Sequence, residues 1–133
     1  MAFLVKFGLI LLAVGAWTGW IVAAQLAMPQ LFERLRIREP RRLLQLHLDY
    51  VIMGVLVIAV GAVLPDLPVW VQVLIVIGTV LNPLLFLPLA FGPRASEALW
   101  FRLISVASFA CVTAGLTAAA VIEIGRASCR ERV

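Results

Sequence analysis

Charged residues are scarce in this chain of 133 residues: they make up 14%, whereas an ordinary soluble domain has about 25%. The chain has one histidine, one tyrosine and two cysteines, while 64% of its residues are hydrophobic. This composition excludes a soluble globular enzyme and a disordered chain, because so few polar groups cannot cover a surface in water. Two cysteines are also too few for a disulfide framework or a zinc site.

Long hydrophobic runs take the place of the missing polar residues. They cover residues 7–28, 43–64, 69–91 and 100–122. Each is long enough for a helix across a hydrocarbon core about 30 Å thick, which needs about 20 residues. Within lipid the backbone must satisfy its own hydrogen bonds, so these runs are expected to be helices. The short connections between them predict an all-α membrane protein, a single domain over residues 1–122 folded as an antiparallel up-and-down bundle of four transmembrane helices.

The last eleven residues, 123–133, differ abruptly in composition from the apolar run before them. Their sequence, EIGRASCRERV, resembles the translation of a common sequencing adapter. We therefore interpret them as a non-native tail and leave them out of the fold prediction. We expect them to have no packing role and to project as a helix end or coil.

Arginines gather on one side of the predicted bundle. Lys6 is the one cationic residue expected on the opposite side. The clustered residues are Arg34, Arg36, Arg38, Arg41, Arg42, Arg94 and Arg102. The positive-inside bias places them in the cytoplasm and both termini outside, as in a multi-pass protein of a bacterial-type inner membrane. Nucleic-acid binding is the alternative explanation of the cluster, but a loop between two spans favours lipid headgroups, and we expect no nucleic-acid partner.

The third hydrophobic run contains polar residues and a proline. Pro83 removes a backbone hydrogen bond and crowds the carbonyl of Thr79, so a kink is expected there. Asn82 lies beside that kink. Its amide has two interpretations: it satisfies the freed carbonyl, or it lines a cavity.

The second run carries the residues with the most chemistry: His47, Asp49 and Tyr50. Ionisable groups inside a membrane are costly and mark candidate sites. His47 and Tyr50 share a helical face with Gly54, whereas Asp49 points elsewhere. The alternative is that all three lie near the membrane edge, where Asp49 pairs with a loop arginine and His47 contacts headgroups. A single histidine excludes haem ligation by two histidines of one chain.

These features together resemble the small four-helix membrane family that includes styrene oxide isomerase and hydroxylaminobenzene mutase. The resemblance implies that His47 is the axial ligand of a haem b. The ferric iron would act as a Lewis acid on an epoxide oxygen, and the mutase branch would rearrange an arylhydroxylamine. The stretches that carry the resemblance are Gly15, Thr18 and Gly19 in the first run, His47, Leu48, Asp49 and Gly54 in the second, and Gly78, Thr79 and Asn82 in the third.

One position departs from the family pattern. The family has an asparagine six residues after the histidine, where it helps to hold the substrate, and this chain has Met53. Counting about 1.5 Å per residue from the helix ends places Asn82 at a similar depth on the neighbouring helix. We therefore expect Asn82 to supply the polar contact with the substrate. Any catalytic role for a tyrosine would belong to Tyr50. Loss of the catalytic arrangement is the other interpretation.

Two functions remain open at this stage. The first is a haem-assisted isomerase acting on a small apolar substrate. A chain this short is expected to enclose haem between protomers of a homo-oligomer. The small-residue faces of the first and fourth helices would then form the contacts; on the fourth these are Ala107, Cys111, Gly115 and Ala119. The alternative is a non-catalytic membrane subunit that packs with partner helices.

The arginine bias predicts the orientation of the connections. Single cysteines at Asp66 or Ala2 should react with membrane-impermeant thiol reagents added outside, while cysteines within residues 33–42 should not. Labelling in intact cells measures this. Reaction of the arginine-rich connection from outside would overturn the orientation.

Overall fold

Four long helices dominate the computed structural model, which describes residues 2–133. Short helices occupy the two connections at the arginine-rich end, and the described residues contain no strand. The all-α fold class is therefore confirmed. The long helices are α1 (Phe3–Ala27), α3 (Arg41–Val63), α4 (Val69–Leu84), which α5 (Phe86–Phe91) continues, and α6 (Leu99–Glu131). The short ones are α2 (Pro29–Arg34) and the 3-10 helix η1 (Pro93–Glu97).

Each long segment is long and apolar enough to cross a membrane, with α4 and α5 together forming the third span, Val69–Phe91. At most 28% of the residues in the most apolar window of any span are buried within the chain. The remaining hydrophobic surface needs an apolar surrounding, which a bilayer supplies. The chain is thus a multi-pass membrane protein with four candidate spans.

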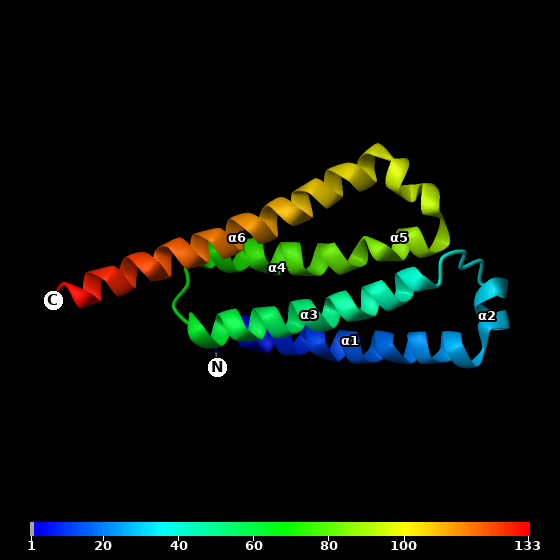
Figure 1. The fold of residues 1–133 in the computed structure, drawn as a ribbon, viewed down its shortest axis with the longest axis horizontal. Helices are drawn as coiled ribbons and strands as arrows, with labels where there is room; N and C mark the ends of the chain where they lie inside the picture. Colours follow the sequence, from blue (N-terminus) through cyan, green and yellow to red (C-terminus); the bar gives the residue numbers. More distant parts are fainter. Residues whose placement is uncertain (1) are drawn as a thin grey trace.

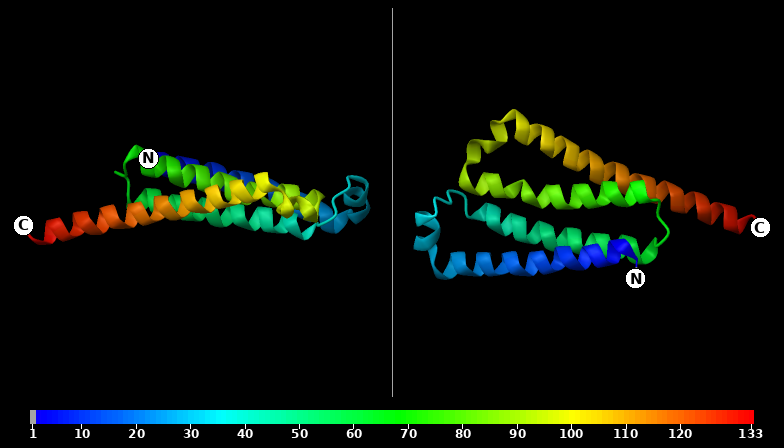
Figure 2. Two further views of the ribbon diagram at one scale, coloured as in Figure 1. Left: turned by 90° about the horizontal axis from the view of Figure 1, so that it is seen from above. Right: turned by 180° about the vertical axis from the view of Figure 1, so that it is seen from behind.

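The helices pack antiparallel in the order α1, α3, α4, α6, as Figure 1 shows. The closest pairs are α1 with α3 and α4 with α6, and α3 joins the two pairs by packing against α4. Across residues 2–133, no Cα atom of α6 lies within 8 Å of one in α1 or α3, although Ala119 of α6 belongs to the core that all four long helices share. The bundle is therefore an open arrangement, with α1 and α6 at its two edges (Figure 2).

Glycines set the close approach of both pairs. A Cβ atom on Gly54 in α3 would lie 3.0 Å from the backbone nitrogen of Leu12 in α1, so the backbones nearly touch there. In the second pair, a Cβ atom on Gly78 in α4 would lie 2.8 Å from the backbone nitrogen of Val112 in α6. The buried Ser108 hydroxyl of α6 donates to the Gly78 carbonyl at 3.2 Å. Packing of this kind is how helices associate in lipid.

The predicted role of the small-residue faces needs correction. We expected them to form contacts between protomers, but Gly15 and Gly19 of α1 face α3 within the chain. Gly115 of α6 faces Ile75 of α4, and Ala119 is buried in the same core. The glycines and Ala119 are thus used inside the chain, where each helix hairpin packs its two backbones together, whereas Ala107 is exposed and Cys111 is only partly buried.

The third span passes from α4 to α5 at Leu85, whose own backbone is helical (φ −63°, ψ −24°). The kink expected at Pro83 stays a prediction. Pro83 is buried inside α4, and α5 begins at Phe86. Pro88 provides the physical reason for the end of α4: it has no N–H to donate to the carbonyl of Leu84, the last residue of α4, and its ring crowds that carbonyl.

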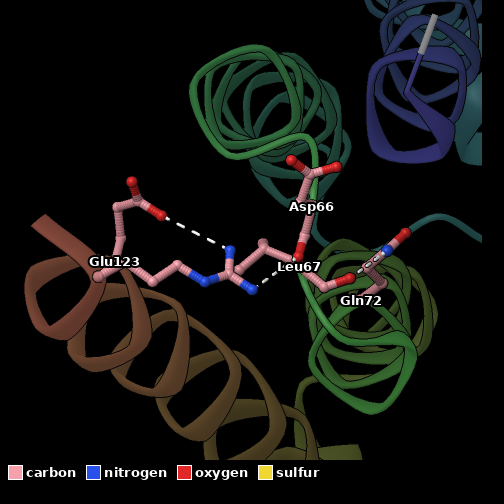
Figure 3. A network of polar contacts seen from close by, with 5 residues as sticks. Asp66, Leu67, Gln72 and Glu123 are labelled. Atoms are coloured by element: carbon pink, nitrogen blue, oxygen red, sulfur yellow. Dashed lines mark hydrogen bonds and ion pairs between the residues drawn. The ribbon is translucent and has the colours of Figure 1, made fainter. Parts of the chain in front are cut away.

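Residues beyond 122 continue α6 as a regular helix to Glu131, which projects past the ends of the other helices (Figure 1). The Arg126 guanidinium donates to the Asp66 carbonyl at 3.2 Å and lies 3.8 Å from a Glu123 carboxylate oxygen (Figure 3). In the same view, the Gln72 amide donates to the Leu67 carbonyl at 2.7 Å and closes the turn before α4. The origin of residues 123–133 stays a prediction.

The helix contact at Gly78 predicts a large effect for a small substitution. Gly78→Ala should lower the free energy of unfolding in detergent by about 1–3 kcal/mol, because the added methyl group meets the backbone of α6. Gly125→Ala is the matched control, since nothing lies within 4 Å of that helical position. It should be neutral or stabilise by up to about 1 kcal/mol. Equal effects of the two substitutions would contradict the close approach.

Candidate functional site

The polar residues of α3 lie on two different faces of the helix near the arginine-rich end. His47 contacts α1, and Tyr50 is buried in the core that α3 shares with its neighbours. Asp49 is directed to α4. The predicted division of the helix into two faces is therefore confirmed, with Gly54 on the α1 side.

The imidazole of His47 is held by α1. Its Nδ1 lies 2.8 Å from the Gly15 carbonyl oxygen, so Nδ1 carries the proton and donates it there. The Thr18 hydroxyl donates to the same carbonyl at 2.7 Å and lies 3.4 Å from Nδ1. The ring lies against Gly19, where a Cβ atom would be 3.0 Å from Cε1. Any larger residue at position 19 would displace the imidazole.

This contact joins two stretches that the sequence analysis had treated separately. The resemblance named Gly15, Thr18 and Gly19 in the first run and His47 in the second, but it implied no bond between the Gly15 carbonyl and His47. The only sequence signal was the spacing of small residues in the first run. A backbone acceptor leaves no trace in residue type, so the pairing itself was not predictable.

The arrangement at His47 fits one requirement of a haem ligand. With Nδ1 donating to a backbone carbonyl, Nε2 is the nitrogen with the lone pair, which is the orientation that metal-bound histidines show. His47 itself is only partly buried. An apolar groove of about 680 Å³ runs along α1 at the arginine-rich end of the bundle. Thr18 is among the residues that line it, and His47 is not. A porphyrin on Nε2 would therefore need a surrounding that extends beyond this chain.

Asp49 and Asn82 form the second polar contact. The Asn82 side-chain nitrogen donates to Oδ2 of Asp49 at 2.9 Å, across the boundary between α3 and α4. The expected pairing of Asp49 with a loop arginine is not seen: within residues 2–133 it forms no ion pair, and Arg42 instead donates to Gln45 at 2.8 Å. Asn82 thus has a carboxylate partner, which neither interpretation of its amide had included.

The two remaining candidate positions lie in the apolar core. Tyr50 is 6% exposed and packs in the largest cluster of buried residues. Met53 is partly buried against the same cluster. Asn82 binds Asp49, which precedes Met53 by one helical turn. Asn82 therefore lies at nearly the depth of Met53 that its distance from the helix end predicts. The structure does not pair Asn82 with His47: His47 bonds to α1, whereas Asn82 of α4 bonds to Asp49 on the other face of α3.

Comparison with known proteins finds no matching family model, no similar curated protein and no similar solved structure. The resemblance to the isomerase and mutase family accordingly stays a prediction. The roles of His47, Tyr50 and Asn82 also stay predictions.

The Asp49–Asn82 contact predicts an energetic coupling between α3 and α4. In a double-mutant cycle, Asp49→Ala and Asn82→Ala should be coupled by about 0.6 kcal/mol, the average for hydrogen bonds inside membranes, and by no more than about 1.7 kcal/mol. Unfolding in detergent measures the four stabilities. The matched cycle of Asp49→Ala with Arg42→Ala should show no coupling. If only the second cycle shows coupling, the partner of Asp49 is Arg42 and not Asn82.

Proposed function

We propose that this membrane protein is an isomerase that binds haem b through Nε2 of His47. The observation that supports the proposal is the hydrogen bond from Nδ1 to the Gly15 carbonyl, which orients the ring and fixes its tautomer. When bound, haem supplies a ferric Lewis acid for the oxygen of a small aromatic epoxide or an arylhydroxylamine. His47 is the single histidine of the chain, so it is the residue that would hold the group.

The protein's own groups position the ligand rather than carry out the bond changes. Thr18 and His47 share the Gly15 carbonyl, and Gly19 leaves room for the imidazole against α1. Asp49 accepts one N–H of the Asn82 amide, which leaves the amide oxygen and the second N–H for a substrate. Tyr50 is the only phenol of the chain and lies three residues from the histidine.

A homo-oligomer completes this proposal. His47 is only partly enclosed by its own chain, and α1 lies at one edge of the open bundle. A second protomer against that edge would cover the porphyrin, and a small apolar substrate would enter from the bilayer. The arginine-rich end faces the cytoplasm of a bacterial-type inner membrane in this proposal, with both termini outside.

A second candidate is a non-catalytic membrane subunit. The outer surface of α1 favours it, because Trp17 and Trp20 are 74% and 73% exposed, and large aromatic side chains are frequent anchors of protein interfaces. In that case His47 has a packing role alone. The two candidates differ in whether the purified protein is coloured.

Haem binding distinguishes the two candidates directly. Protein produced in haem-replete cells should show a Soret absorption band, and His47→Ala should lose it while the helical circular dichroism is retained. Asn82→Ala is the matched variant: it should keep the band and lower the turnover of an aryl epoxide. If the wild-type protein is folded but shows no Soret band, the isomerase proposal is wrong and the proposal of a non-catalytic subunit remains.

A further inference from the structure

The apolar groove of about 680 Å³ runs along α1 at the arginine-rich end of the bundle. Its walls are α1 and α5, and α2, the segment that follows it and the start of α3 close one end. Every lining residue except Thr18 is hydrophobic. Those that define the walls are Val14, Ile21, Ala24, Leu87 and Phe91, and those that close the end include Phe32 and Ile37.

The length of the groove matches one leaflet of a bilayer. The wall on α1 runs from Val14 to Ala24, which is about 15 Å at about 1.5 Å per residue. The hydrocarbon core is about 30 Å thick, so half of it is the depth of one leaflet. A chain lying in the groove would therefore span the leaflet from near the midplane to the arginine-rich end.

The closed end of the groove is built on a defined helix terminus. The Ile37 N–H donates to the Phe32 carbonyl at 3.1 Å, and the Arg36 N–H donates to the Glu33 carbonyl at 3.0 Å. This pair of bonds is a Schellman motif, with Phe32 and Ile37 packed together below it. The segment is tied to α5 because the N–H groups of Arg38 and Glu39 both donate to the Ala90 carbonyl, at 2.9 and 3.0 Å.

Arg36 occupies the position of this motif that glycine normally takes. Its φ is 59°, the left-handed region, and it is the only non-glycine residue with positive φ among residues 2–133. A side chain there costs conformational energy that a glycine would avoid. Since folding alone favours glycine at this position, the arginine requires another explanation. Its chain neighbours Leu35 and Ile37 both line the groove, so Arg36 is anchored at the rim.

Within the described residues 2–133, the arginines around this rim form no ion pair. Arg34, Arg36, Arg38 and Arg41 are exposed. The connection also contains Glu33 and Glu39, but within residues 2–133 neither forms an ion pair. The rim therefore offers an unneutralised positive surface to whatever occupies the groove.

We propose that the groove binds one acyl chain of an anionic phospholipid from the leaflet on the arginine-rich side, with its phosphate held by Arg36 and its neighbours. An apolar trough one leaflet long, with free arginines at its outer end, complements such a lipid in both shape and charge. This assignment is independent of haem binding.

Tryptophan quenching by brominated lipids tests the proposal in the membrane. A protein retaining Trp20 alone, with the other three tryptophans changed to phenylalanine, reports on the groove, which Trp20 lines. In phosphatidylcholine vesicles, phosphatidylglycerol brominated on its chains should quench Trp20 at a mole fraction about 5-fold lower than brominated phosphatidylcholine does, which corresponds to one well-placed arginine. A protein retaining Trp100 alone is the control, because that residue lies outside the groove near Arg94 and Arg102.

Substitution of the rim completes the experiment. Arg36→Gly should remove most of the preference for the anionic lipid and raise the melting temperature by about 4 °C, because the left-handed strain is relieved. Arg94→Gly removes the same charge elsewhere on this side and should leave the preference unchanged. Equal quenching of Trp20 by the two lipids, or the same preference at Trp100, would overturn the proposal. A preference that survives Arg36→Gly would also overturn it.

Discussion

Close backbone contact between α1 and α3 is the constraint on which the candidate site depends. Helices in lipid gain little from burying apolar side chains against each other, so they associate through small residues and hydrogen bonds. Gly54 brings α3 against Leu12. One to two turns further on, Gly15 and Gly19 allow the His47 ring to reach a backbone carbonyl of α1. A wider helix separation would leave Nδ1 without this partner.

Three polar side chains of the membrane segments each join two helices, whereas hydroxyls such as those of Thr79 and Ser105 bond within their own helix. The His47 imidazole joins α3 to α1, the Asn82 amide joins α4 to α3, and the Ser108 hydroxyl joins α6 to α4. These hydrogen bonds therefore connect the helices in the same order in which they pack: α1, α3, α4, α6. Because no described Cα atom of α6 lies within 8 Å of one in α1, the arrangement has two edges, and both edges carry exposed apolar side chains.

Hydropathy was sufficient to predict the four long helices, and helical periodicity was sufficient to place His47 and Asp49 on different faces of α3. Neither signal specifies which helices are neighbours or which backbone atom a side chain meets. The partner of His47 is a carbonyl 32 residues away, and the partner of Asp49 is 33 residues away. The passage from α4 to α5 at Leu85 required weighing Pro83 against Pro88, and only the second proline removes a bond at the point where α4 ends. Orientation in the membrane rests on charge alone.

Thr18 connects the two parts of the molecule to which we assign binding. Its side chain lines the apolar groove, and its hydroxyl donates to the carbonyl that also accepts Nδ1 of His47. An acyl chain in the groove therefore packs against the residue that shares an acceptor with the imidazole. Thr18 is partly buried, so an apolar chain in the groove would shield its hydroxyl further and make its hydrogen bond to Gly15 costlier to break. The groove and the imidazole thus share one contact residue, although neither proposed ligand requires the other.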